Sequence, residues 1–418
     1  MNRTAFAPAC RSSMLATVAL VLLGTLTGCQ PKPATPQVNE GTPRVRVRLL
    51  AGVNRVVLTA DRQTVVRDSA HARETGLVLD PSRDIALTYD GNAWRCGEWS
   101  LANTPSLRID PAADGAVSVN GSPYRGTYTL EAVGPNKIDV INEVDVENYL
   151  RGVLARELFA DWQPEAYKAQ AVIARTYALY EIRTNPPNRS WDLNPDERSQ
   201  VYGGMKAETA KATAAVAATG GIVVAHGQPG RERIFKAYFS SCCGGVAASA
   251  ADVFNETATP PLSAHDNGRT CAISPKYSWP AVAFSKAELT RRIRAWGTKQ
   301  GRAEATLPGV RTIEVASLNA YGRPRSFVLT DVRGQQYLLT AEQMRWAINS
   351  EPNNGPTILS GYFRPVDTGD AIRLEDGHGF GHGVGACQWC MQGRALASQA
   401  WQTIVVSQYP QSVLVRAY

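Results

Sequence analysis

Near residue 145, the sequence changes from a series of strand-like segments to a helix-like segment. Between residues 43 and 145, the segments RVRVRLL, RGTYTLEAV and KIDVINEV alternate in polarity with a period of two. This period is typical of strands with one buried face. Turn sequences such as DPSRD, YDGN and VNGS separate them. We therefore expect a β-rich region over residues 43–140.

The segment that follows predicts a long helix over residues 164–182, PEAYKAQAVIARTYALYEI. It begins with proline, which suits a first helical position, and its alanines keep the helix narrow enough for other elements to approach closely. Further helices are expected over about 205–219 and over 286–297, with strands between them and again over 310–340. Because strands and helices do not alternate regularly, we expect an α+β fold rather than a doubly wound parallel sheet.

Residues 1–29 resemble a secretion signal. The apolar run MLATVALVLLGTL is too short for a membrane-spanning helix, and LTGC after it resembles a bacterial lipobox. This implies cleavage before Cys29 and lipidation of its sulfur; the alternative is an ordinary signal peptide. Residues 30–42, rich in proline and polar residues, predict a flexible tether. We expect a lipid-anchored protein of the cell envelope that faces the periplasm or cell wall, with Gln30 favouring the outer membrane in a Gram-negative cell.

The composition limits the classes of partner. The 418 residues are 44% apolar and 19% charged, as in an ordinary globular protein. The net charge of +7 is spread along the chain, without a run of Lys or Arg that would indicate nucleic-acid binding. We therefore expect no nucleic-acid partner, and contact with a membrane only through the lipid anchor.

One carboxylate lies in the apolar stretch VLARELFADW, residues 153–162. Burial would raise the pKa of Glu157, so that it could protonate a leaving oxygen near neutral pH, as the general acids of glycosidases do. A structural alternative is a helix cap or a surface charge. Hydrolysis would need a second carboxylate. The candidates for this second group are Asp145, Glu147, Asp161 and Glu165.

Several motifs resemble, in order, those of the stage II sporulation protein D (SpoIID/LytB) family. The core motif is VDVENYLRGVLARELFADWQPEAYKAQAVIARTYAL. The later motifs are SQVYGG, TAAVAATGGIVV, AYFSSCCGG, SPKYSW and GHGFGHGVGACQW. The resemblance runs from about residue 140 to 412 and implies a mixed α+β catalytic domain over residues 141–412.

The resemblance implies a peptidoglycan lytic transglycosylase that cleaves between N-acetylmuramic acid and N-acetylglucosamine, on strands denuded of stem peptides. Glu157 stands at the family's catalytic glutamate. Lytic cleavage needs no second acid, because the C6 hydroxyl of muramic acid attacks C1 and one group acts as acid and then as base. Some relatives are described as modifiers of amidases. The alternative is therefore a non-catalytic glycan-binding protein or an activator of a cell-wall amidase.

Eight polar residues of these motifs are candidate substrate-binding groups. Gln170 and Arg175 lie in the predicted long helix, where they form either a structural hydrogen-bond network or, for Arg175, a site for the lactyl carboxylate of muramic acid. Tyr202 is a candidate for stacking on a sugar ring. The loop GHGFGHG, whose glycines allow close approach to a ligand, is expected to enter a helix near Val384. The remaining candidates are Ser240, Ser241, His378, His382 and Gln388.

Six cysteines follow Cys29 in the sequence. An even number outside the cytoplasm favours disulfides. Four of them lie in motifs that the resemblance places at one cleft, which favours a structural tetrahedral zinc site. Both alternatives stay open, with free thiols as a third, and no cofactor is expected for the chemistry itself. His265 is a substitute ligand, and Cys96 has no assigned partner. The four candidate ligands are Cys243, Cys271, Cys387 and Cys390.

Overall fold

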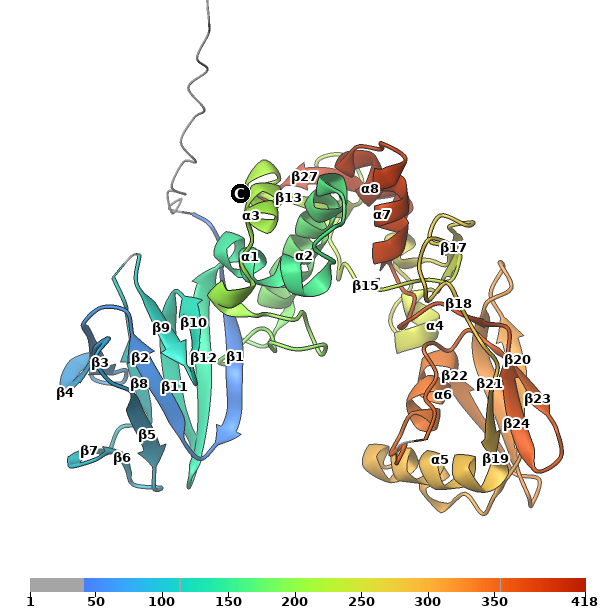
Figure 1. Cartoon of the computed structure of the whole chain (residues 1–418), viewed down its shortest axis with the longest axis horizontal. Helices are drawn as coiled ribbons and strands as arrows, with labels where there is room; N and C mark the ends of the chain where they lie inside the picture. The colour runs from blue at the N-terminus through green and yellow to red at the C-terminus, as the bar shows by residue number, and fades with distance from the viewer. Residues whose placement is uncertain (1–40, 113, 354) are drawn as a thin grey trace, which may run out of the picture. The chain divides into compact units, whose positions relative to one another are not determined.

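The computed structural model describes residues 41–112, 114–353 and 355–418 (Figure 1). The predicted signal, Cys29 and most of the predicted tether lie outside these residues, so the lipid anchor stays a prediction. Across the described ranges, no helix is both long and apolar enough to cross a membrane. Helices and strands are both abundant, which confirms the predicted α+β class.

The β-rich region folds as two six-stranded sheets that share one hydrophobic core (Figure 1). Its strands are β1 (Arg44–Val53), β2 (Val56–Ala60), β3 (Thr64–Asp68), β4 (Arg73–Leu79), β5 (Ile85–Tyr89), β6 (Ala93–Cys96), β7 (Trp99–Ala102), β8 (Ser106–Ile109), β9 (Ala116–Val119), β10 (Ser122–Arg125), β11 (Thr127–Gly134) and β12 (Lys137–Asp145). The sheet orders are β1-β12-β11-β8-β3-β4 and β10-β9-β2-β5-β6-β7. In β1, alternate residues such as Val45 and Val47 are fully buried, as the period of two predicted. In β12, by contrast, residues 138–142 are all buried, so the alternation expected for KIDVINEV is not seen there.

Strand β12 leads directly into the helical region, which begins with α1 (Val146–Glu157), α2 (Pro164–Thr184), η1 (Gly204–Ala207) and α3 (Ala210–Ala218). The carboxylate of Asp145 caps α1. Helix α2 begins at the predicted proline. The helix predicted over 205–219 is divided into η1 and α3, and the side chain of Thr209 caps the second part.

Helix α2 lies at the centre of a second core. Besides α1 and α3, this core includes α7 (Gln388–Leu396), α8 (Trp401–Gln408), β13 (Ile222–His226), β14 (Arg233–Ile234) and β27 (Val413–Arg416). The three strands form a sheet in the order β14-β13-β27. The buried face of α2 is rich in alanine, so α1, α3, α7 and α8 all pack closely against it. The small residues of the motif therefore serve helix packing.

Residues 278–376, here called the inserted region, contain a third core. Its longer elements are β19 (Val282–Ser285), α5 (Lys286–Gln300), η3 (Ala303–Thr306), β20 (Val310–Leu318), β21 (Pro324–Asp331), β22 (Gln336–Thr340), α6 (Ala341–Ile348), β23 (Arg364–Asp367) and β24 (Ala371–Glu375). They form two three-stranded sheets, β20-β21-β22 and β19-β24-β23. The stretch assigned from sequence to one catalytic domain, 141–412, thus contains two hydrophobic cores.

Short elements before, at the start of and after the inserted region connect it to the second core. They are β15 (Phe239–Ser240), β16 (Val246–Ala247), α4 (Ala250–Phe254), η2 (Pro260–Leu262), β17 (His265–Asp266), β18 (Ser278–Trp279), β25 (Gly377–His378) and β26 (Ala386–Cys387). The sequence predicted that the Gly-rich loop enters a helix near Val384, and this prediction is wrong. The loop first forms β26, which pairs with β15 in parallel, and α7 begins only at Gln388.

Candidate functional site

The carboxylate of Glu157, the last residue of α1, is held by groups from two distant segments. The backbone NH of Val201 donates to Oε1 at 2.9 Å. Nε2 of Gln388 lies 3.4 Å from Oε2 and also donates to the backbone oxygen of Glu157 at 3.2 Å. The site is therefore assembled from the end of α1, the SQVYGG motif and the start of α7.

Burial raises the pKa of Glu157 above its ordinary value. The hydrogen bonds from Val201 and Gln388 oppose this effect, and the nearby charge of Glu197 adds to it. The side chain is half-buried rather than enclosed, so a substrate can reach it. Such a carboxyl group holds its proton to a higher pH than an exposed glutamate and suits a general acid.

The four acids considered as a second carboxylate are engaged elsewhere or exposed. Asp145 caps α1, Glu147 pairs with an arginine of α2, and Glu165 pairs with Lys168 at 2.6 Å. Asp161 is exposed. Within the described ranges, none of the four shares a hydrogen bond with the carboxylate of Glu157.

Of the predicted residues, Gln388 contacts Glu157, and Ser240 and Ser241 lie beside the segment that carries Gln388. Ser240 pairs with Cys387 across β15 and β26, and the backbone oxygen of Ser241 accepts a hydrogen bond from the NH of Trp389 at 3.1 Å. Both serines therefore lie beside the first turn of α7, which carries Gln388. Ser241 is half-buried, whereas Ser240 is buried.

An aromatic cluster next to Glu157 was missed in the sequence analysis. The ring centroids of Phe159 and Trp162 are 5.5 Å apart, and those of Trp162 and Trp389 are 4.9 Å apart. Phe159 remains 59% exposed. The signal was present, because two of these residues lie in the apolar stretch around Glu157 and the third follows Gln388. Exposed aromatic rings of this kind can pack against the apolar face of a sugar.

Tyr202 is not available to stack on a sugar. It is buried, and its ring packs between Tyr124 and Tyr149 with centroid distances of 5.5 and 4.9 Å. Its hydroxyl lies 3.3 Å from Oδ1 of Asn142. The ring therefore belongs to the packing between β12 and α1, and the stacking hypothesis is corrected.

Arg175 forms a structural network, the first of the two alternatives. It is fully buried, and its Nε and Nη2 donate to the two carboxylate oxygens of Glu147 at 2.9 and 2.7 Å. The same carboxylate accepts from the NH of Gly221 and from the hydroxyl of Tyr418. Gln170 is also fully buried. Neither residue is exposed to a lactyl carboxylate.

Among the described residues, neither histidine of the Gly-rich loop forms a hydrogen bond with the carboxylate of Glu157. Burial lowers the pKa of His382 to about 4, so the ring is neutral, and its Nδ1 accepts from the NH of Val384 at 2.9 Å. His378 lies between Tyr277 and Tyr362, at centroid distances of 5.9 and 5.1 Å.

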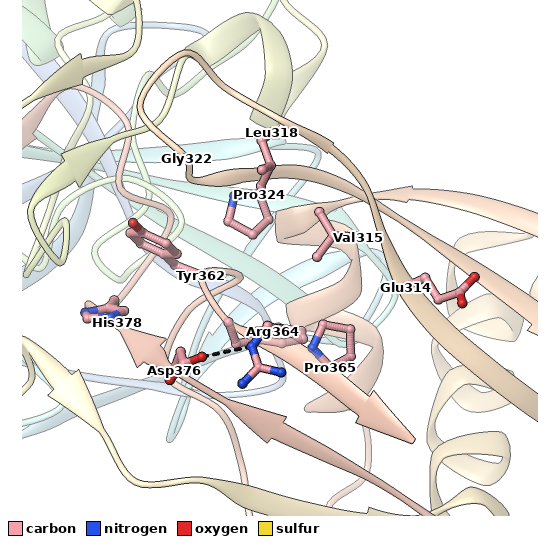
Figure 2. Close-up of a pocket in the computed structure, with 11 residues that line it drawn as sticks. Glu314, Val315, Leu318, Gly322, Pro324, Tyr362, Arg364, Pro365, Asp376 and His378 are labelled. Atoms are coloured by element: carbon pink, nitrogen blue, oxygen red, sulfur yellow. Dashed lines mark hydrogen bonds and ion pairs between the residues drawn. The ribbon is translucent and has the colours of Figure 1, made fainter. Parts of the chain in front are cut away.

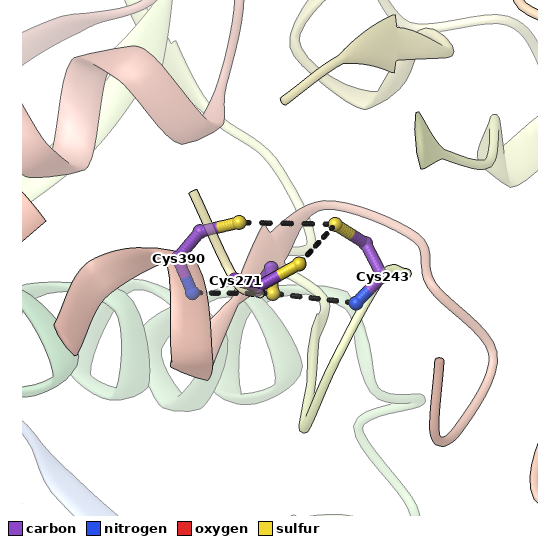
Figure 3. A group of neighbouring side chains, drawn as sticks. Cys243, Cys271 and Cys390 are labelled. Carbon is purple, nitrogen blue, oxygen red and sulfur yellow. Dashed lines mark hydrogen bonds between the residues drawn. The ribbon is translucent and has the colours of Figure 1, made fainter. Parts of the chain in front are cut away.

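The four predicted thiols converge in one buried cluster, and Figure 3 shows three of them, Cys243, Cys271 and Cys390. Their sulfur atoms all lie within 4.8 Å of one another. The sulfur of Cys243 is 3.7 Å from that of Cys271 and 3.8 Å from that of Cys390. Four thiolates bound tetrahedrally to zinc would be about 3.8 Å apart, given Zn–S bonds of about 2.3 Å. The spacing therefore fits a metal, and every described cysteine is free of a disulfide.

Arg323 adds a positive charge next to this cluster. It is buried, and its guanidinium donates to the backbone oxygens of Cys243 at 2.9 Å and His382 at 3.1 Å. Among the described residues it forms no ion pair with a carboxylate. Burial lowers its pKa, and the charge of Cys243 opposes this effect. A buried cation without an acid suits a site with net negative charge, as four thiolates around a divalent metal would have.

Comparison with known proteins relates this chain to the SpoIID family and to several bacterial proteins. The family model described as SpoIID, stage II sporulation protein, matches residues 135–226. An uncharacterized protein of Brachyspira hyodysenteriae (strain ATCC 49526 / WA1) is 30% identical over 293 residues, which cover 70% of this chain and 72% of the relative.

Two further relatives are matched over less of their length or of this chain. The amidase enhancer of Bacillus subtilis (strain 168) is 24% identical over 352 residues, 74% of this chain. The match covers 47% of the amidase enhancer, so this chain spans about half of that protein's length. An uncharacterized protein of Chlamydia muridarum (strain MoPn / Nigg) is 31% identical over 196 residues, 44% of this chain and 66% of the relative.

The buried pair of Arg175 and Glu147 generates a first prediction. Arg175→Met should lower the free energy of unfolding by about 3–5 kcal/mol, because it leaves a largely buried carboxylate without its partner. Urea unfolding measures this change. The double variant Arg175→Met/Glu147→Gln should recover part of the loss. If Arg175→Met is as stable as wild type but binds glycan more weakly, the result would instead support the hypothesis that Arg175 binds substrate.

Proposed function

Because the chain belongs to the stage II sporulation protein D (SpoIID) family, we propose that it is a peptidoglycan lytic transglycosylase. The observation that carries the proposal is the half-buried carboxyl of Glu157, with its raised pKa and two oriented hydrogen-bond donors. Among the residues that the structure describes, no second carboxylate is hydrogen-bonded to it. A single acid of this kind suits a reaction in which the substrate supplies its own nucleophile.

In the proposed reaction, protonated Glu157 donates its proton to the oxygen between N-acetylmuramic acid and N-acetylglucosamine, and the bond from C1 to this oxygen breaks. The resulting carboxylate then accepts the proton of the muramic acid C6 hydroxyl as that oxygen bonds to C1. The products are a 1,6-anhydromuramic acid end and a free N-acetylglucosamine hydroxyl. Glu157 is protonated again, and no water is consumed.

The neighbours of Glu157 have positioning roles in this proposal. Val201 and Gln388 hold the carboxylate in one orientation, which keeps the proton aimed at the leaving oxygen. Ser241, beside the first turn of α7, is placed to bind sugar hydroxyls. Phe159 and Trp389, which lie 5.8 Å apart, offer apolar surface to a sugar ring.

The second candidate function is activation of a cell-wall amidase, with the chain binding glycan but not cleaving it. The observation that favours it is the similarity to a protein named amidase enhancer. Both functions place the chain at the cell wall, and both accommodate the predicted lipid anchor at Cys29. They differ in whether Glu157 is required.

Glu157→Gln should lower product release by at least about 100-fold, because general acid–base catalysis contributes about 10²–10⁴ in rate. The measurement is mass spectrometry of soluble products from amidase-treated sacculi, and wild type should release ends that carry 1,6-anhydromuramic acid. Glu165→Gln is the matched control and should leave release unchanged, since Glu165 pairs with Lys168.

Two outcomes would contradict the proposal. Products with reducing ends would mean hydrolysis by water, and a second carboxylate would then be required. No products from wild type, with retained binding to sacculi and activity only when an amidase is added, would favour the activator function.

The same substitution should also reveal the cost of burying Glu157. Because the pKa of Glu157 is raised in the folded state, the unfolded chain binds fewer protons at this group between its ordinary value and the raised one. The stability that protonated Glu157 contributes is therefore lost as pH rises from its ordinary pKa through its raised pKa. Thermal unfolding should show Glu157→Gln more stable than wild type at pH 7 and equal to it near pH 4. A variant less stable than wild type at pH 7 would contradict this explanation.

We also propose that Cys243, Cys271, Cys387 and Cys390 bind a structural zinc ion. The spacing of the sulfur atoms and the buried charge of Arg323 support it. Four protein ligands leave no open position for water, so the metal would stabilise the fold rather than take part in the reaction. Since Gln388 lies between two of the ligands in sequence, the cluster would hold this side chain against Glu157.

Metal analysis of the purified chain should find about one zinc ion per molecule. Chelation under reducing conditions should lower the Tm by at least about 5 °C, because binding to the folded state alone stabilises it. Cys390→Ser should lose the metal, whereas Cys96→Ser should keep it. A metal-free protein whose intact mass shows thiols oxidised in pairs would establish disulfides instead.

A further inference from the structure

A pocket of about 570 Å³ that the proposed reaction does not use is lined by the inserted region and by His378 of the adjoining β25 (Figure 2). One edge is apolar and is formed by Val315, Leu318 and Pro324 from the hairpin of β20 and β21. The opposite edge is polar and is formed by Arg364, Asp376 and His378. Figure 2 shows Tyr362 at one end, between the two edges. Glu157 is not among the lining residues.

The charges that line the pocket disfavour an anionic ligand. Glu314 and Asp376 contribute two carboxylates, and Arg364 is the single arginine of the lining. This guanidinium is already engaged, since it donates to Asp376 at 2.9 Å and to Glu375 at 2.5 Å. An anion would therefore meet an excess of carboxylate. The pocket instead offers carboxylate acceptors to hydroxyl or amide donors of an uncharged ligand.

Tyr362 supplies a fixed aromatic ring. Its ring centroid lies 5.1 Å from that of His378, and the guanidinium of Arg323 lies 5.1 Å from the ring on the side of the thiol cluster. The ring is half-buried, so part of it faces the pocket. A fixed ring between an apolar edge and a row of polar groups matches the two kinds of surface on an N-acetylated sugar.

A second cavity of about 610 Å³ adjoins the first, because Asp376 and His378 line both. Trp279 and Ser278 contribute to this second cavity. Adjoining cavities with a shared polar edge suit a chain of rings rather than an isolated small molecule.

We propose that the pocket in the inserted region binds an uncharged N-acetylhexosamine unit of a glycan chain. The apolar C–H face of the sugar packs on Tyr362, its hydroxyls bond to the edge of Arg364 and Asp376, and its N-acetyl methyl group lies against Leu318. The choice of glycan rests on the proposed function at Glu157, whereas the preference for a neutral sugar rests on the lining of the pocket itself.

The test measures the binding of N,N′-diacetylchitobiose to the full chain by saturation-transfer NMR. Tyr362→Ala and Leu318→Asp should each weaken binding by at least about 10-fold. Leu318 is 54% exposed, so Leu318→Asp should not disturb folding. This variant therefore decides the question if Tyr362→Ala fails to fold. Trp346→Ala is the aromatic control, because Trp346 is 44% exposed on α6 and lies outside the pocket lining. This variant should bind the disaccharide as wild type does.

A second probe tests the charge argument. N-acetylmuramic acid, which carries a carboxylate, should bind more weakly at this pocket than N-acetylglucosamine. Tighter Tyr362-dependent binding of the anionic sugar would overturn the proposal. A second result would also overturn the proposal. If Leu318→Asp leaves binding of the neutral disaccharide unchanged and Gln388→Ala abolishes it, the ligand lies at Glu157 instead.

Failure of this proposal is distinguishable from failure of the transglycosylase proposal. If sacculi yield no anhydro ends but disaccharide binding depends on Tyr362 and Leu318, the pocket is supported and the reaction is not. If anhydro ends are released and neither substitution alters disaccharide binding, the pocket proposal is overturned and the reaction stands.

Discussion

The site depends on holding one half-buried carboxyl group by hydrogen bonds without placing a cation beside it. A cation beside Glu157 would lower its pKa and favour the ionised form, which cannot donate a proton. The structure instead provides neutral donors, the backbone NH of Val201 and the amide of Gln388. These donors orient the carboxylate, while burial keeps its pKa raised. The two segments that carry them must therefore be fixed against the end of α1.

The segment that carries Gln388 is fixed by an unusual set of neighbours. Cys387, which precedes Gln388, accepts hydrogen bonds through its sulfur from the NH groups of Cys243 and Cys390, both at 3.3 Å. Arg323 also contacts the Gly-rich loop, because its guanidinium donates to the backbone oxygen of His382. A Cβ atom at Gly383, where φ is +74°, would lie 2.4 Å from the guanidinium. Position 383 therefore needs glycine because the buried guanidinium occupies the space of a side chain, a packing reason that differs from the ligand approach expected from sequence.

Residue patterns near one another in the chain were reliable guides. The strands of 43–140 and the start of α2 followed from period and capping chemistry, which are local. Glu157 was identified from its apolar neighbours and the family motifs. The polar residues of α2 were less predictable, because the sequence does not say which partner a buried group meets. Arg175 donates to Glu147, and the same carboxylate accepts a hydrogen bond from the hydroxyl of Tyr418, which lies 271 positions further along the chain.

By itself, the sequence determined the α+β class, the family, the position of Glu157 and the identity of the four thiols. Only the tertiary structure decided that Tyr202 is packed away from solvent, that Gln388 meets Glu157, and that Tyr362 and His378 line a pocket of the inserted region. The physical reason is that burial and hydrogen-bond partners depend on contacts between segments far apart in the chain. The motifs show which groups are present, but the packing of the second and third cores decides which of them face a ligand.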